Sequence, residues 1–178
     1  MFPRLLRRIS TSPFAQDFRG PPEPQRPRTI VSLPIYREAM QVTFSTQSAR
    51  FMTKGKYLYV KERGSVLVEF APRALEQKPE EKKVCTLAAE DFYHILHLQE
   101  DIQLSKRFKT HTAVLSFQRI AEDIRLSLEL QQDVPVHRSI DLRSGEFFMV
   151  QQYLRYALPY TIGWFALGNA ELATQHAD

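Results

Sequence analysis

Lysine, arginine and tyrosine alternate along one short stretch of the chain, residues 51–64. If this stretch is a β-strand, its outward face carries these basic and aromatic side chains: Lys54, Lys56, Tyr57, Tyr59, Lys61 and Arg63. Ammonium and guanidinium groups neutralise phosphates, and exposed tyrosine rings stack on bases. The pattern therefore predicts a single-stranded nucleic-acid surface. An ordinary solvated sheet face has the same composition, so both interpretations stay open.

Further cations extend this surface if their strands lie alongside, namely Arg37, Lys106, Arg107, Lys109, Arg119 and Arg125. The net charge of the chain is a weaker indicator of nucleic-acid binding than these local groups. The chain carries +4, but residues 1–30 hold six arginines and two acids, and 6 − 2 is also +4. The rest of the chain is neutral by count, so nucleic-acid binding would depend on local patches or on a basic partner.

Motifs that mark catalytic sites do not occur in the sequence, which contains no GxGxxG, Walker A, HExxH or GxSxG pattern. His94 and His97 share a predicted helix, but a metal site needs three or four convergent ligands, and polar helix-face histidines are the commoner explanation. His111 and His137 are isolated. Cys85 is the only cysteine, which excludes an internal disulfide and fits a reducing compartment. We expect a binding protein without metal or cofactor, not an enzyme.

The N-terminus has the composition of a mitochondrial presequence. Residues 1–12 hold three arginines, three Ser or Thr residues and no acid, together with an apolar face. Residues 13–29 are a proline-rich linker, a nucleic-acid-binding domain is expected at 30–170, and 171–178 form a tail. The expected location is the mitochondrial matrix; a disordered basic tail is the alternative interpretation of 1–12. No stretch approaches 18 uncharged apolar residues, so we expect no membrane partner.

Hydrophobic periodicity predicts two groups of strands, each followed by a helix. Strands are expected at 30–36, 39–45, 51–61 and 65–70, with a turn at 62–64, and again at 101–109, 111–119, 123–131 and 134–141. Helices are expected over 86–98 and from Ser144 to about Gly168, with a bend or restart at Pro159. Short connections favour antiparallel pairing, so we predict an α+β fold with antiparallel sheets in the order ββββαββββα.

The last predicted helix is apolar on more than one face. The residues that we expect at an oligomer interface are Leu154, Leu158, Tyr160, Ile162, Trp164 and Phe165. A helix of this kind needs cover on both sides. Its own domain supplies one side and a second subunit the other; a buried core helix in a monomer is the alternative.

The segment Ala157–Asn169, ALPYTIGWFALGN, closely resembles the C-terminal helix segment of the Whirly proteins, plant organellar single-stranded DNA-binding proteins. Glu69–Pro72 is similar to the end of that family's fourth strand, and Val84–Leu87 leads into the helix at the expected place. The same fold is found in kinetoplastid mitochondrial RNA-binding proteins, which anneal guide RNA to messenger RNA in uridine-insertion editing. The leader MFPRLLRRIS looks more like those mitochondrial proteins.

One departure favours the kinetoplastid branch. Plant Whirly proteins carry a KGKAAL signature on the second strand, but the matching position here falls near Tyr36–Met40, and Lys54-Gly-Lys56 lies one strand later. The resemblance implies two four-stranded antiparallel sheets with two helices, assembled as a tetramer through the helices. It also implies RNA on the sheet surfaces and a heterotetramer of two related chains. Because this chain is neutral, we expect its paralogue to be the more basic one.

Residues and resemblance together predict a mitochondrial, sequence-independent RNA-binding protein that promotes annealing of guide RNA to messenger RNA in RNA editing. Two alternatives stay open at this point: a Whirly-like single-stranded DNA-binding protein, and a structural subunit of a mitochondrial ribonucleoprotein complex.

Overall fold

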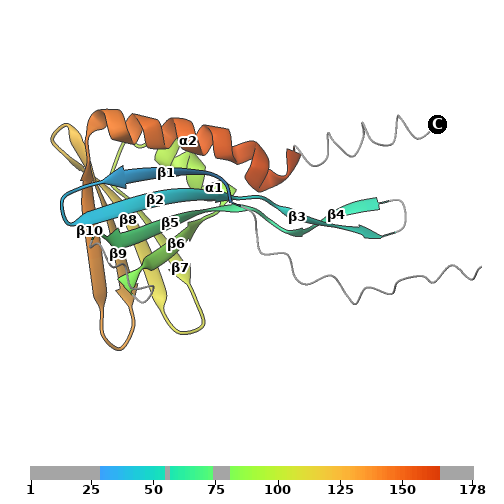
Figure 1. The fold of residues 1–178 in the computed structure, drawn as a ribbon, viewed down its shortest axis with the longest axis horizontal. Coiled ribbons are helices and arrows are strands. Elements are labelled where there is room, and N and C mark those ends of the chain that lie inside the picture. Colours follow the sequence, from blue (N-terminus) through green and yellow to red (C-terminus); the bar gives the residue numbers. More distant parts are fainter. Residues whose placement is uncertain (1–28, 55–56, 74–80, 165–178) are drawn as a thin grey trace, which may run out of the picture.

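Two four-stranded antiparallel sheets and two helices form the body of the protein in the computed structural model, which describes residues 29–54, 57–73 and 81–164 (Figure 1). The first sheet has the order β1-β2-β5-β6, with β1 at Thr29–Tyr36, β2 at Met40–Gln47, β5 at Ser65–Pro72 and β6 at Lys83–Leu87. The second has the order β10-β9-β8-β7, with β7 at Ile102–Arg107, β8 at Thr112–Ile120, β9 at Asp123–Gln131 and β10 at Val136–Leu142. The predicted α+β class and the two sheets are confirmed.

A two-stranded hairpin of β3 (Arg50–Lys54) and β4 (Tyr57–Glu62) extends β2 and β5 beyond the first sheet (Figure 1). The prediction of one strand over 51–61 with a turn at 62–64 was therefore wrong. The chain reverses between Lys54 and Tyr57, and β4 continues almost directly into β5. Alternation alone could not reveal this reversal, because both arms of the hairpin keep the same period of two.

The fourth strand of the first sheet is β6, part of which we had assigned to the helix over 86–98. Cys85 and Leu87 alternate into the core, where they pair with Val68 and Val66 of β5. Helix α1 is correspondingly shorter, Ala89–Leu96. At the other edge, β1 pairs with β2 alone among the described strands, as the proline at position 34 predicts for an edge strand.

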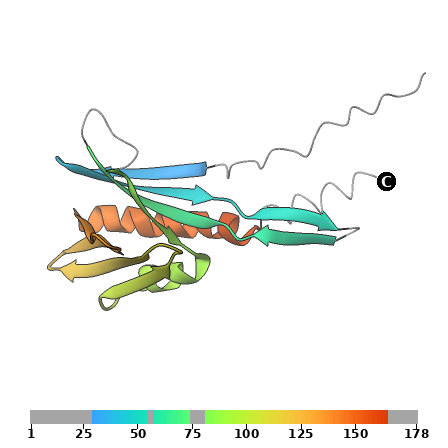
Figure 2. The ribbon, with the colours of Figure 1, turned by 90° about the horizontal axis from the view of Figure 1, so that it is seen from below.

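Helix α2, Ser144–Ile162, runs between the two sheets and contacts both of them (Figure 2). The strands of the second sheet run across those of the first (Figure 1). Alternate residues of each central strand meet in one core between the layers, where Phe44, Phe117 and Leu126 are fully buried. No helix of the described residues is long and apolar enough to cross a bilayer.

The start of α2 differs slightly from the prediction. Arg143, not Ser144, occupies the N-cap position, and the carboxylate of Glu146 accepts a hydrogen bond of 2.8 Å from the Arg143 backbone N–H. An acid in the first turn also complements the helix dipole. The helix continues through Pro159 to Ile162 without restarting, so the proline marks its last turn and not a new helix.

The end of α2 is fixed to the base of the β3–β4 hairpin. The last carbonyls of a helix have no partner within the helix. Here the carbonyl oxygen of Tyr160 accepts from the Ala49 N–H at 3.2 Å, and that of Thr161 accepts from the Gly64 N–H at 2.9 Å. Gly163 then ends the helix with φ of 85°, a left-handed conformation that favours glycine. The glycines at 64 and 163 therefore position the hairpin against the helix.

Candidate nucleic-acid interface

The β3–β4 hairpin presents aromatic and basic side chains on one of its two faces. Residues opposite one another in an antiparallel pair share a face, and here Met52 pairs with Tyr59 and Lys54 with Tyr57. We call these four residues the aromatic face of the hairpin. Tyr57 and Tyr59 are 58% and 48% exposed, and their ring centroids lie 6.3 Å apart. Two exposed rings at this spacing offer a stacking platform for bases.

Positive charge accompanies this aromatic face. Lys54 and Lys61 are exposed and form no ion pair with another described residue, whereas Lys56 lies outside the described residues. Arg63 follows β4, and its Nη1 atom lies 2.6 Å from Oε1 of Glu90. Both of those side chains are largely exposed, and such a pair contributes only about 0–1 kcal/mol. A phosphate can therefore replace the Glu90 carboxylate at Arg63.

Three other predicted cations already hold a carboxylate of this chain, so a phosphate there would have to replace that partner. Arg125 donates from Nε and Nη2 to the two oxygens of Asp141, at 2.8 and 3.0 Å. The hydrogen bonds from this guanidinium lower the pKa of Asp141. Lys106 points inward from β7, with its Nζ atom 2.5 Å from Oδ2 of the buried Asp91 on α1. The third cation is Arg37, which forms the network described next.

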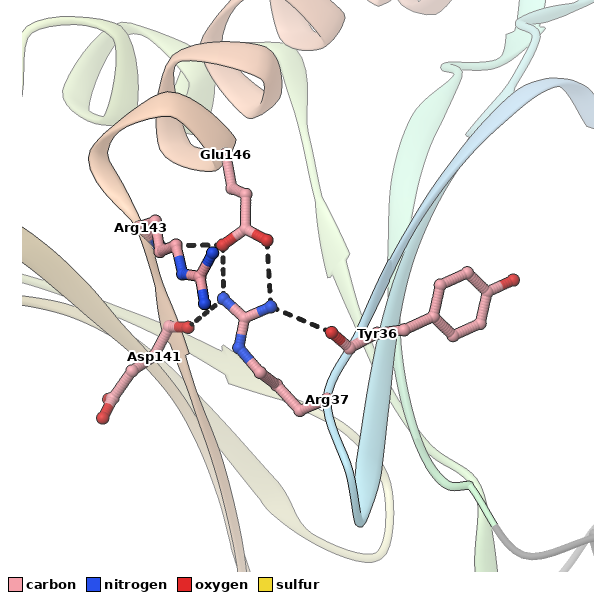
Figure 3. A network of polar contacts seen from close by, with 5 residues as sticks. All are labelled: Tyr36, Arg37, Asp141, Arg143 and Glu146. Carbon is pink, nitrogen blue, oxygen red and sulfur yellow. Dashed lines mark hydrogen bonds and ion pairs between the residues drawn. The ribbon is translucent and has the colours of Figure 1, made fainter.

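Arg37 joins the first sheet to the second sheet and to α2 (Figure 3). Its guanidinium donates to both carboxylate oxygens of Glu146 and, at 2.7 Å, to the backbone carbonyl oxygen of Asp141. A further bond of 2.9 Å reaches the carbonyl oxygen of Tyr36. This fork of hydrogen bonds raises the pKa of Arg37 and lowers that of Glu146. Arg37 is therefore a structural tie between layers, because its donors are already satisfied within the fold.

Replacing Glu146 by Gln is expected to lower the free energy of unfolding by about 1–2 kcal/mol at pH 7, in the range for a partly exposed hydrogen bond to a charged group. The pKa of Glu146 is lower in the folded state than in the unfolded state, so its ionised carboxylate stabilises the fold at pH values above the unfolded-state pKa. This stabilisation is lost as the pH falls through the folded-state pKa. Urea titrations at pH 7 and below the ordinary glutamate pKa should therefore show the difference between wild type and Glu146→Gln shrinking in acid. A difference that stays constant across this range would contradict the role of the ion pair.

The tip between β7 and β8 forms a second exposed basic and aromatic cluster. The rings of Phe108 and His111 stack, with centroids 4.9 Å apart and an interplanar angle of 20°. Arg107 and Lys109 flank Phe108, are exposed, and form no ion pair with other described residues. The sequence analysis had named the two cations but missed Phe108 and His111, although an aromatic between two basic residues was a usable signal. Arg119 is placed differently, with its side chain donating to the Leu98 carbonyl oxygen at 3.3 Å.

The outer face of the second sheet carries hydroxyls and amides more than free charge. Register places Ser139, Ser127, Ser116 and Gln103 in one row over its four strands, and of these only Ser116 is buried. The neighbouring row contains the neutralised pair of Arg125 and Asp141. This face offers hydrogen bonds to sugars or base edges, and the unpaired positive charge of the site residues lies on the two hairpins.

Several exposed side chains of α2 are apolar, beside the exposed Arg155, but they are not all the residues that the sequence indicated. Leu154 is fully buried in the core of its own chain, so its assignment to an interface was wrong. Leu158 packs partly against the same core, while Tyr160 and Ile162 are half-buried and Trp164 is 67% exposed. Phe165 lies outside the described residues. The structure adds two exposed apolar residues that the sequence had not indicated, Phe148 and Met149, and Tyr156 is exposed beside them.

The histidines of α1 give no sign of a metal centre. The rings of His94 and His97 lie against Tyr93, with centroids 5.7 and 4.7 Å from the tyrosine ring. Within the described part of the chain, no group of three or more His, Cys, Asp or Glu residues is arranged to hold a metal ion. Burial raises the pKa of the Cys85 thiol to about 11, so this side chain acts as a core residue.

Three solved structures with the same arrangement are of plant proteins. WHY1 from Arabidopsis thaliana superposes with a TM-score of 0.74 at 20% identity, covering 83% of this chain and 94% of its own. The chain has the Whirly fold. WHY3 from Arabidopsis thaliana gives a TM-score of 0.74 at 20% identity over 84% and 99% of the two chains, and the plant transcriptional regulator PBF-2 gives 0.71 at 18% over 82% and 89%. Neither a scan of protein-family models nor a search of curated proteins finds a match.

Proposed function

We propose that this Whirly-fold chain binds single-stranded nucleic acid without sequence preference and has no catalytic role. The observation that carries the proposal is the aromatic face of the hairpin, where two exposed tyrosines lie beside Lys54 and near Lys61. Tyrosine rings stack on any base, and lysines neutralise the backbone whatever its sequence. A duplex offers the same phosphates but no unstacked bases, so the site favours single strands.

Three further observations support this proposal. The β7–β8 tip repeats the combination of a stacked aromatic pair with flanking cations. One neighbour of the same fold is a plant transcriptional regulator, which is consistent with a role at nucleic acid. The row of hydroxyls and amides on the outer face of the second sheet adds neutral hydrogen bonds to sugars and base edges.

Within this proposal, we infer that the physiological strand is RNA and that the chain promotes annealing of guide RNA to messenger RNA in mitochondria. Neutralised phosphates reduce repulsion between two RNAs, and bases presented outward are free to pair. The presequence-like composition of residues 1–12 and the missing plant signature support this version. Single-stranded DNA is the second candidate, favoured by the plant Whirly structures among the neighbours. A structural role in a mitochondrial ribonucleoprotein complex is the third.

We also propose that the chain works as an oligomer through α2, with a more basic paralogue as a partner. The apolar side chains exposed along the helix motivate this part of the proposal, since exposed aromatic residues are frequent anchors of interfaces. A neutral domain gains affinity for nucleic acid from a basic companion.

Recovering the tagged protein from mitochondria separates the three candidates. The bound nucleic acid is treated with RNase or DNase, sequenced and compared with a mock purification. Guide RNA and messenger RNA, released by RNase alone, are the expected result. Recovery of DNA would favour the second candidate over annealing. Recovery of a ribosome-like particle whose RNA does not exchange with added oligonucleotide would favour the third.

Protein recovered from the organelle should lack about the first ten residues, because a basic presequence rich in Ser and Thr is removed after import. N-terminal peptide mass spectrometry on that material checks this expectation. An intact Met1 on the imported protein would contradict processing at this site.

A further inference from the structure

We propose that the tip between β7 and β8 is a second strand-binding site, which holds a different single strand from the one on the aromatic face of the hairpin. This inference rests on the proposed function and deepens it, because a chain that carries two strands brings them together for pairing. The tip cluster consists of Arg107, Phe108, Lys109 and His111, and both of its cations are exposed. Rings and cations of this kind suit the bases and phosphates of a few nucleotides.

Hydrogen bonds within the tip hold its two rings in place. The Phe108 N–H donates to the carbonyl oxygen of His111 at 2.8 Å, which closes the turn. The hydroxyl of Thr110 lies 3.0 Å from Nδ1 of His111 and fixes the imidazole ring beside the phenyl ring. Phe108 is 38% exposed although it belongs to this stack. A base can therefore stack on the outer side of the pair, and little conformational entropy is lost because the rings are already ordered.

The tip and the β3–β4 hairpin belong to different sheets and point in different directions (Figure 1). The hairpin continues the line of β2 and β5 away from the first sheet, whereas the tip lies at the end of β7 and β8, which run across the strands of that sheet. β7 alone is six residues long and spans about 17 Å. A short strand that lies along the hairpin therefore runs away from the tip.

Acidic side chains lie between the two sites on both described routes. Helix α1 borders the hairpin base and contacts β7, and its first turn carries Glu90 and Asp91, whose carboxylates hold Arg63 and Lys106. On the outer face of the second sheet, the exposed Glu129 lies between the tip and the row of hydroxyls. Phosphates are repelled by these carboxylates, so one strand is not drawn continuously from the hairpin to the tip.

A chain with two separate sites promotes pairing by proximity. Two strands held on one particle meet at an effective concentration on the order of millimolar when their unbound segments are flexible. Each site contains one pair of rings, so it holds a few nucleotides and leaves the rest of its strand available for base pairing. Annealing then needs neither catalysis nor recognition of sequence.

The number of short RNA strands bound per chain tests this inference. Single-stranded RNA of about eight nucleotides, within the roughly 4–16 that one compact site holds, is titrated into the full chain at low salt. Native mass spectrometry counts strands per chain, so the result does not depend on the oligomer. We expect two strands for wild type. Arg107→Ala, Phe108→Ala and Lys109→Ala combined should leave one, because loss of one base stack alone weakens a site about 10-fold.

The rate of annealing is measured on the same proteins with two complementary RNAs that carry a donor and an acceptor dye. The triple tip variant should anneal them about 10-fold more slowly than wild type, in line with its weakened second site. Lys82→Ala with Lys83→Ala removes the same two charges outside both sites and should change neither the count nor the rate. Circular dichroism checks the fold, and Phe108→Ala alone replaces the triple variant if that protein is unstable.

Two outcomes would overturn this inference alone. A wild-type chain that binds one strand, with affinity reduced by tip and hairpin substitutions alike, would mean that a single strand spans both sites. Two strands per chain in a folded tip variant would place the second site elsewhere. A wild-type chain that binds no single strand even at low salt would instead contradict the proposed function, and this inference with it.

Discussion

Replacing Lys54, Lys56 and Lys61 together by alanine is expected to weaken binding of single-stranded nucleic acid about 100-fold at roughly 0.1 M salt. Each lysine that neutralises one phosphate contributes about 0.7 to the slope of log affinity against log salt on a single strand. Losing three contacts should therefore reduce that slope by about 2 and weaken all sequences similarly. Fluorescence anisotropy with labelled oligonucleotides over a range of salt concentrations measures both quantities.

A matched variant controls for net charge. Lys82 and Lys83 precede or begin β6, and β5 runs away from the hairpin before the chain reaches them, whereas Lys78 of the same sequence segment lies outside the described residues. Replacing these three by alanine removes the same net charge without touching the hairpin, so it should change affinity and slope far less. Equal losses in the two triple variants would show that the general field of the protein, and not the hairpin, attracts the strand.

Gly64→Ala should lower the free energy of unfolding by about 3 kcal/mol or more, near the upper end for overpacking a filled site. A Cβ at this position would lie 2.7 Å from the Cα of Thr161 and 2.8 Å from the backbone nitrogen of Ala49, and would also run into the Gln47 carbonyl oxygen. All three are backbone atoms, so no side chain can turn away to make room. The substitution also disturbs the Gly64 N–H bond to the end of α2.

Gly145→Ala is the matched control, because a Cβ there meets nothing within 4 Å. This residue lies in the first turn of α2, where alanine is favoured over glycine by about 0.5–1 kcal/mol, so this variant should be as stable as wild type or slightly more so. Urea unfolding followed by circular dichroism at one fixed protein concentration compares the two. A Gly64→Ala protein as stable as Gly145→Ala would mean that α2 and the hairpin are not held together as described.

Local patterns predicted most of the fold. The alternation of Ile124, Leu126, Leu128 and Leu130 identified β9 correctly, because one face of that strand packs in the core and the other meets solvent. The hairpin and β6 were missed for a physical reason. A reversal inside 51–61 leaves the period unchanged, and Cys85 and Leu87 are assigned to a strand only by their pairing with β5.

The candidate site was predictable only where function depends on local sequence. Tyr57 and Tyr59 are two residues apart, so their shared face followed from strand geometry. The partners of Arg37 and Arg125 lie far along the chain, at Glu146 and Asp141, and no periodicity reveals such an ion pair. The number of basic residues in the sequence is therefore larger than the number of cations that remain free to bind phosphate.

The interface that we propose on α2 was also only partly predictable from the sequence. Leu154 of α2 and Trp164, just after the end of this helix, are both apolar, yet the first is fully buried and the second is mostly exposed. The helix has apolar residues around most of its circumference, so sequence could not tell which side meets the core. The two sheets that enclose α2 decide this, and they are brought together by contacts distant in sequence.

Direct titration of the purified full chain tests the central claim most simply. Labelled single-stranded RNA, single-stranded DNA of the same sequence and the corresponding duplex are each titrated at several salt concentrations, together with scrambled single strands. The account predicts that single strands bind regardless of sequence, that affinity falls roughly linearly with salt on logarithmic axes, and that the duplex binds more weakly. Equal affinity for duplex and single strands, or no binding of single strands even at low salt, would contradict it.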